Sequence, residues 1–291
     1  MPKLVWLNGQ VMPLESAVTS VADHAHLYGD GLFEGIRIYN SRVWKLDEHL
    51  VRLYHGIRFL GFEMSIGIGE LRATLLDVCK QAQISDGYIR LNVSRGTGLG
   101  LDPKGIDRTP NVMIMVSTLA LYPPEAYEQG LSVVTSSIRV ISSDALDPRL
   151  KCIGRYGANI LAKQEANRMG AGEALMLNAQ GQLAECTGDN IFLISNKVIR
   201  TPHGSCGILK GITRDTVIEI AEEAGYKVEE TFLSLFDVFA ADEAFLTGTA
   251  AEVIPMINLD AKNIGDGKPG AVTKDLMARF RHQTATTGVA F

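Results

Sequence analysis

The chain of 291 residues lacks the features that mark membrane, secreted and nucleic-acid-binding proteins. No apolar stretch approaches the roughly 20 residues that a membrane-spanning helix needs. The N-terminus has no long apolar run ending in a small-residue cleavage site, so we expect no secretion signal. The formal net charge is −5 and no basic stripe is present, so we expect neither a nucleic-acid partner nor a membrane surface.

Cysteine is also scarce, and the four residues show no CxxC spacing: Cys79, Cys152, Cys186 and Cys206. This pattern argues against a zinc site and predicts reduced thiols in a cytoplasmic protein. We expect Cys152 to be a small buried filler. No internal repeat or low-complexity tract interrupts a composition that is 46% hydrophobic, which is enough for the cores of two domains.

The pattern of apolar residues and turn signals predicts an α+β fold. Asn8-Gly9 and Asn40-Ser41 each separate two apolar runs and predict tight turns. A helix is expected to be capped by Asp47 and closed by Gly61. Further strands are predicted at 88–93, 112–117, 132–140, 174–177, 191–194, 198–201 and 243–247, and further helices at 71–79, 157–168, 213–224 and 274–281. Hairpins and isolated helices dominate, so antiparallel or mixed sheets are expected in both halves.

Two adjacent prolines at positions 123 and 124 predict a stiff connector. We therefore predict a small α+β domain at 1–120, a linker at 121–131 and a larger domain at 132–291.

Lys151 and Tyr156 lie in the segment RLKCIGRYG, where an extended run meets the start of a helix. A lysine that forms a Schiff base needs an amine held rigidly in a desolvated pocket near cations. A lysine in an apolar stretch is weak support when taken alone. Glu185 precedes an apolar strand and is suited to face a pyridine nitrogen, although a solvated strand-end acid is the simpler interpretation and Asp189 competes for the role.

The segment Gly211-Ile212-Thr213 opens a predicted helix whose first backbone amides and hydroxyl suit a phosphate. Most such helix starts are ordinary caps. Arg52 is able to add a charge-assisted bond to the same phosphate, or to be a solvated helix arginine. Together with Lys151 and Glu185, these parts predict a site for pyridoxal 5'-phosphate.

Three other segments are candidates for the walls of this pocket. Residues 248–252 form a small-residue loop whose amides suit a carboxylate or phosphate, or a plain turn. The segment 28–37 alternates glycines with aromatic and charged residues. Tyr88 and Arg90 share one face of a strand and suit a substrate carboxylate. The nearby histidines are His24, His26 and His49. No other potential metal ligands accompany them, so we expect them to pack or to form hydrogen bonds.

Six motifs occur along the chain in this order: YGDGLFEGIR, EHLVRL, YIR, ECTGDN, GITRD and TGTAAEVIP. Through them the chain resembles the fold-type IV aminotransferases, and among them the branched-chain amino-acid aminotransferases. The resemblance implies a two-domain fold similar to D-amino-acid aminotransferase, with the cofactor on the larger domain. It also implies a ping-pong exchange of amino groups between leucine, isoleucine or valine and 2-oxoglutarate. Homodimers or larger assemblies are implied as well.

The resemblance also implies roles for single residues. Lys151 would form the Schiff base and move the proton, Tyr156 would bind the cofactor's phenolic oxygen, and Glu185 its ring nitrogen. The phosphate would be held by Arg52, Gly211, Ile212, Thr213 and Thr249. Tyr88, Thr249 and Ala250 would bind the α-carboxylate, and Arg90 the second carboxylate of glutamate. The side-chain pocket would be lined by Tyr28, Phe33, Gly35 and Arg37.

One departure from the family pattern is visible beside the lysine, where Ile153 and Arg155 replace a glycine and an asparagine of many relatives. Rival interpretations are a D-amino-acid or (R)-amine aminotransferase, an aminodeoxychorismate lyase, and a cofactor-binding relative without turnover. The FEGIR segment favours the branched-chain type over D-specific relatives, and the presence of Lys151, Tyr156 and Glu185 argues against lost turnover.

Overall fold

The computed structural model describes residues 2–119 and 121–291, which form two compact units. The first unit contains residues 1–119, 150–155 and 284–291, and the second contains residues 120–149 and 156–283. The predicted linker at 121–131 holds the short helix α4 (Pro124–Gln129). The predicted division of the sequence at this linker stays a prediction.

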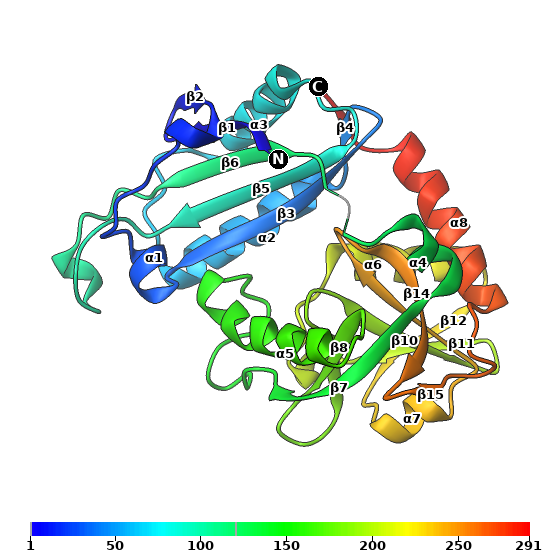
Figure 1. Cartoon of the computed structure of the whole chain (residues 1–291). Coiled ribbons are helices and arrows are strands. Elements are labelled where there is room, and N and C mark those ends of the chain that lie inside the picture. Colours follow the sequence, from blue (N-terminus) through cyan, green and yellow to red (C-terminus); the bar gives the residue numbers. More distant parts are fainter. Residues whose placement is uncertain (1, 120) are drawn as a thin grey trace. The chain divides into compact units, whose positions relative to one another are not determined.

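The first unit is built on an antiparallel sheet with the strand order β16-β4-β3-β5-β6-β1-β2 (Figure 1). Its strands are β1 (Pro2–Leu7), β2 (Gln10–Met12), β3 (Gly31–Tyr39), β4 (Arg42–Val43), β5 (Gly87–Ser94), β6 (Val112–Ser117) and β16 (Val289–Ala290). The helices of this unit are α1 (His24–Tyr28), α2 (Leu46–Leu60) and α3 (Ile68–Ala82).

Both predicted tight turns of the first unit are confirmed. Asn8 and Gly9 have φ values of 48° and 97° and join β1 to β2. Asn40 and Ser41 have φ values of 49° and 57° and join β3 to β4. Two successive positive φ angles match the right-handed twist of the flanking strands, which explains the choice of residues.

The predicted cap of α2 is wrong at one end and right at the other. The N-cap is Lys45 in a left-handed conformation, and Asp47 lies in the first turn, where it accepts a hydrogen bond from Arg72 at 2.7 Å. An acidic side chain in the first turn still favours the helix through the macrodipole. Gly61 closes the helix at φ 69°, as predicted.

Helices α2 and α3 cover one face of this sheet, α2 over β3 and α3 over β1 and β6 (Figure 1). The alternation along β5 follows from this cover. Ile89, Leu91 and Val93 are fully buried, whereas Tyr88 and Arg90 on the opposite face are only partly buried. The face of β5 away from the helices therefore carries partly buried polar side chains.

The second unit contains a closed barrel. Its strands are β7 (Leu131–Arg139), β8 (Glu173–Leu177), β9 (Leu183–Cys186), β10 (Asn190–Ser195), β11 (Val198–Pro202), β12 (Lys227–Thr231), β13 (Glu243–Gly248), β14 (Glu252–Leu259) and β15 (Lys262–Asn263). Neighbouring strands pair in the order β10-β13-β14-β7-β8-β9, and β9 pairs with β10 to close the ring. Parallel pairs β14–β7, β7–β8 and β11–β12 make the sheet mixed, so the predicted α+β class is confirmed.

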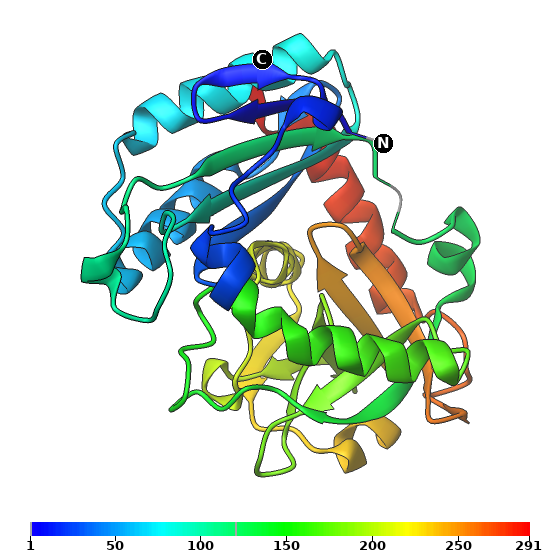
Figure 2. The same cartoon turned by 60° about the vertical axis from the view of Figure 1, so that its left-hand side comes forward.

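The helices of the second unit are α4, α5 (Tyr156–Arg168), α6 (Ile212–Glu223), α7 (Leu235–Phe239) and α8 (Ala271–Thr286), the last of which ends in residues of the first unit. Helix α5 lies along β7 and β8 (Figure 2) and buries Ala162 and Ala166 against them. The predicted helices and strands of this half are confirmed within a few residues. The strands β9, β12, β14 and β15 and the short helices α4 and α7 were not predicted. In the described part of the chain, no helix is long and apolar enough to cross a bilayer.

All four cysteines are buried and none forms a disulfide. Burial raises the pKa of Cys79 to about 12 and raises the pKa values of Cys186 and Cys206 above the usual range for thiols. Cys152 is 7% exposed, which confirms its expected place as a buried filler.

Removal of one ring from the second unit's core should show how strongly the barrel depends on packing. Phe192 and Phe245 are opposite each other on β10 and β13, fully buried, with ring centroids 4.8 Å apart. Phe245→Ala is expected to lower the free energy of unfolding by about 3–5 kcal/mol in a denaturant titration. The matched control is Phe236→Ala, whose ring is 79% exposed and whose loss should change stability by less than about 0.5 kcal/mol. Similar losses in both variants would contradict the assignment of this core.

Candidate active site

One face of β3 and β5 carries most of the predicted substrate-binding side chains. In the antiparallel register, Gly35 lies opposite Arg90 and Arg37 lies opposite Tyr88. Phe33 lies opposite Asn92. Directly opposite residues share a face, so this register places the predicted residues of both strands together.

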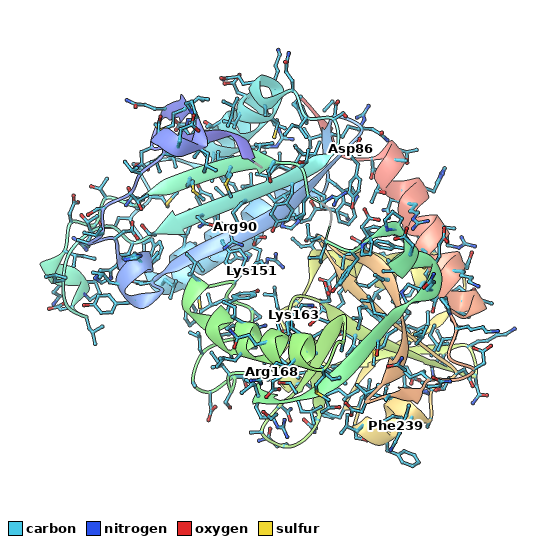
Figure 3. All side chains as sticks on the ribbon, in the orientation of Figure 1. Asp86, Arg90, Lys151, Lys163, Arg168 and Phe239 are labelled. Carbon is cyan, nitrogen blue, oxygen red and sulfur yellow. The ribbon has the colours of Figure 1, made fainter. Side chains whose placement is uncertain are left out.

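Lys151 joins this face through the backbone of β3. The Phe33 amide donates a hydrogen bond to the Lys151 carbonyl at 3.0 Å, and Cys152 forms an isolated bridge with Leu32. The Lys151 Nζ lies 4.5 Å from the centroid of the Phe33 ring, and the Arg90 guanidinium carbon lies 3.5 Å from the same centroid. Figure 3 shows both cationic side chains extending from this part of the first unit. The structure thus brings an amine, an aromatic ring and a guanidinium together.

Gly35 leaves the space that the Tyr88 hydroxyl occupies. A Cβ atom on Gly35 would overlap this hydroxyl, so any larger residue would displace the tyrosine. Arg37 places its guanidinium carbon 4.9 Å from the centroid of the Tyr39 ring. Because Gly35 has no side chain, the Tyr88 hydroxyl can lie against the backbone of β3.

Tyr28 is placed differently from the other predicted pocket residues. It ends α1, before β3 begins, and its hydroxyl accepts a hydrogen bond from the Gly100 amide at 3.1 Å. Its ring is in edge contact with the ring of His24, at 4.9 Å between centroids. Its hydroxyl thus binds the loop that follows β5, and its place in the substrate pocket stays a prediction.

On the helix-covered face of β3, Glu34 binds two side chains of α2. Its carboxylate accepts bonds from Arg52 Nε at 2.8 Å and Nη2 at 2.6 Å, and from His49 Nδ1 at 2.7 Å. Burial alone would raise the pKa of Glu34, but the charge and hydrogen bonds of Arg52, helped by His49, outweigh it and hold the pKa at about 2. Glu34 is therefore a buried anion that orients Arg52.

Burial is also the main reason why the pKa of His49 lies below its usual value. Glu34 raises it, but burial, together with the positive charges of Arg52 and Lys151, prevails. His49 is then neutral at pH 7, with Nδ1 donating to Glu34. His24 likewise contacts a carboxylate, at 3.0 Å from Asp30. The hydrogen-bonding roles predicted for these two histidines are confirmed.

In the second unit, Glu185 lies on β9 and is 7% exposed. Its Oε2 accepts the Leu209 amide at 2.8 Å and the Asn190 side-chain amide at 3.3 Å. Donors of this kind hold a carboxylate in one orientation. Asp189 is also buried, and a Cβ atom on Gly248 would overlap one of its side-chain oxygens.

The N-terminus of α6 is built to receive an anion. Gly211 is the N-cap and supplies no side-chain cap, so the first amides of the helix are not satisfied by it. The Thr213 hydroxyl in the first turn is buried and has no hydrogen-bond partner among the described residues. A buried polar group is normally bonded, so an unbonded hydroxyl beside free helix amides fits a bound phosphate.

The loop between β13 and β14 is a three-residue hairpin connection, with Gly248 paired to Glu252. Thr249 and Ala250 lie in this turn and are partly exposed. Tyr156 begins α5, five residues after Lys151 in the sequence. Its binding role and those of Thr249 and Ala250 stay predictions.

Within the second unit, the buried Glu185 carboxylate fits the ring nitrogen of pyridoxal phosphate, and the uncapped start of α6 with the unbonded Thr213 hydroxyl fits its phosphate. Lys151, in the first unit, offers an amine of the kind that forms a Schiff base. No group of three or more His, Cys, Asp or Glu residues in the described ranges is arranged to hold a metal ion. Sequence reasoning did not single out Glu34, which accepts hydrogen bonds from Arg52, or Asn190, which donates to Glu185. Their signals were present, because Glu34 lies between Phe33 and Gly35, and Asn190 ends the ECTGDN segment.

Comparisons with known proteins identify the family of this chain. The model of the amino-transferase class IV family matches residues 31–259. A protein of Methanocaldococcus jannaschii, provisionally described as a branched-chain-amino-acid aminotransferase, is 40% identical over 286 residues, which are 98% of each chain.

Two solved structures are also similar over nearly the whole chain. The crystal structure of the Escherichia coli branched-chain amino acid aminotransferase has a TM-score of 0.94 at 32% identity, covering 99% of this chain and 96% of that one. The crystal structure of the Thermobaculum terrenum branched-chain amino acid aminotransferase in its PLP-form has a TM-score of 0.88 at 30% identity, covering 98% of this chain and 94% of that one.

The buried Glu34 carboxylate should make stability depend on pH in the acid range. Its pKa is about 2 in the folded protein and 4.5 in its ordinary state, so its stabilisation is complete above about pH 4.5. It is lost as the pH falls through 2, and amounts to on the order of 3 kcal/mol. In Glu34→Gln this part of the pH dependence should disappear in denaturant titrations between pH 5 and 2. If the free energy of unfolding of the variant depends on pH as steeply as that of the wild type, Glu34 is not the titrating group.

Proposed function

Because the chain belongs to the amino-transferase class IV family, we propose that it is a pyridoxal-phosphate-dependent branched-chain aminotransferase. It exchanges amino groups between leucine, isoleucine or valine and 2-oxoglutarate in two half-reactions. The observation that carries the proposal is similarity over almost the full length to relatives of that name. The amine of Lys151 beside Phe33 and Arg90 supports it.

Lys151 provides the nucleophilic amine and carries the proton to and from the substrate α-carbon. Pyridoxal phosphate, when bound, supplies an aldehyde that condenses with amines and a ring that accepts electrons from the α-carbon. Glu185 would pair with the ring nitrogen, and Tyr156 would donate to the phenolic oxygen. The phosphate would be held by the amides and hydroxyl at the start of α6, with help from Arg52 and Thr249.

The mixed character of the β3–β5 face supports the choice of substrates. One pocket must accept an apolar side chain in one half-reaction and a carboxylate in the other. The Phe33 ring offers an apolar surface, and the planar guanidinium of Arg90, whose Nε donates to Asn92 at 2.7 Å, is of the type that recognises a carboxylate. Tyr88 and the Thr249–Ala250 amides receive the α-carboxylate.

We also propose that the enzyme acts in the cytoplasm as a homodimer or larger assembly. Four buried thiols without a disulfide support a reducing compartment. The assembly follows from the family resemblance, and size-exclusion chromatography with light scattering tests it.

Lys151→Ala should abolish turnover, because the variant loses the amine that condenses with the cofactor aldehyde. The exposed lysine variant Lys80→Ala is the control and should keep the wild-type rate. The decisive measurement uses the holoenzyme: borohydride treatment followed by peptide mapping should find the cofactor label at position 151. A label at any other position, or normal turnover in Lys151→Ala, would refute the role of this lysine.

Arg90→Ala should reduce kcat/KM for 2-oxoglutarate about 10- to 100-fold more than for 2-oxoisocaproate, because a charge-assisted bond to the second carboxylate is lost. Arg72→Ala, which removes an arginine from a surface ion pair with Asp47, is the matched control. Equal losses for the two oxo acids would contradict the role of Arg90. Turnover with L-leucine and with D-alanine as the amino donor shows whether the enzyme uses L- or D-amino acids.

A further inference from the structure

Asn190 lies where two strands of the barrel meet the candidate cofactor site. It is the first residue of β10, 6% exposed, and opposite Glu185 on β9 and Thr247 on β13. None of the roles proposed above uses its side chain. A buried amide that is not part of the chemistry needs a structural partner for each polar group.

Its amide nitrogen binds two acceptors at once. Nδ2 donates to the Leu209 carbonyl at 2.9 Å and to Glu185 Oε2 at 3.3 Å. The Leu209 amide in turn donates to the same Glu185 oxygen at 2.8 Å. These three hydrogen bonds link Asn190, Glu185 and Leu209 in a closed ring. Leu209 lies two residues before Gly211, the N-cap of α6.

The other side-chain atom of Asn190 lies over Gly211. A Cβ atom on Gly211 would overlap Asn190 Oδ1, whereas the φ of −72° at Gly211 suits any residue. Glycine at the N-cap is therefore required by the asparagine side chain and not by the backbone conformation. Asp189 stands over Gly248 in the same way, so two successive side chains each lie over a glycine.

We propose that Asn190 is a positioning residue that sets the spacing between the Glu185 carboxylate and the first turn of α6. This inference rests on the proposed function, in which Glu185 binds the ring nitrogen of pyridoxal phosphate and α6 binds its phosphate. One amide holds both groups, because Nδ2 bonds Glu185 and the residue that leads into α6. A correct spacing lets a rigid cofactor contact both ends without strain, which increases affinity by preorganisation.

The first test is Asn190→Asp, which keeps the shape and replaces the donor by an acceptor facing Glu185 and the Leu209 carbonyl. The affinity of the cofactor-depleted full-length enzyme for pyridoxal phosphate should fall about 10- to 100-fold, measured by titration of visible absorbance. Affinity for pyridoxal, which lacks the phosphate, should fall less, because only one end is then held. A general loss of packing would lower both affinities by the same factor.

Asn178→Asp is the matched control. Asn178 is also buried, donates to a side-chain amide of Gln182, and lies in the turn between β8 and β9. The Asn178→Asp variant should keep the wild-type ratio of the affinities for pyridoxal phosphate and pyridoxal. If Asn190→Asp and Asn178→Asp give the same ratio, Asn190 has no positioning role. If the wild-type protein itself binds no pyridoxal phosphate, the proposed function fails first.

A second pair of variants keeps the proposal testable if Asn190→Asp does not fold. Gly211→Ala should weaken pyridoxal phosphate binding, because the new methyl group displaces Asn190. In the Asn190→Ala background, where that side chain is gone, the same Gly211→Ala change should have little further effect. Equal effects in both backgrounds would overturn the inference.

Discussion

The pairing of β9 with β10 at Glu185 and Asn190 is the constraint on which the second unit depends. This contact closes the ring of strands and leaves no open edge between β9 and β10. The same two residues are bonded through their side chains, and through Leu209 they reach the start of α6. The contact that closes the barrel therefore also fixes the Glu185 carboxylate relative to the start of α6.

In the first unit, strand β3 holds cationic side chains in place on both faces of the sheet. Glu34 is fully buried and accepts three bonds from Arg52 and His49, so its desolvation is offset within a few ångströms. A neutral His49 adds a donor without a second positive charge. On the opposite face of the same strand, the Phe33 ring contacts both Lys151 and Arg90. One strand therefore positions cations on both of its faces through side-chain alternation.

Sequence patterns predicted local features well and long-range ones poorly. The Asn8-Gly9 hairpin and the Gly61 helix end depend on neighbouring residues and are confirmed. Strand β14 was missed because Pro255 interrupts its pattern, although that proline pairs with Phe245 within the sheet. The contact between Phe33 and Lys151 joins residues far apart in the chain, and no periodicity reveals it. The hydrogen bond from Asn190 to the Leu209 carbonyl likewise joins residues that are separated in the sequence, and only the fold shows it.

The burial of every native thiol has a practical consequence. Alkylating reagents attack thiolates, and burial suppresses both their formation at Cys79, Cys186 and Cys206 and access by the reagent. A single cysteine engineered at a solvent-exposed position would therefore react well before the native ones. Fluorophores or spin labels can be attached to the wild-type background without first removing any residue.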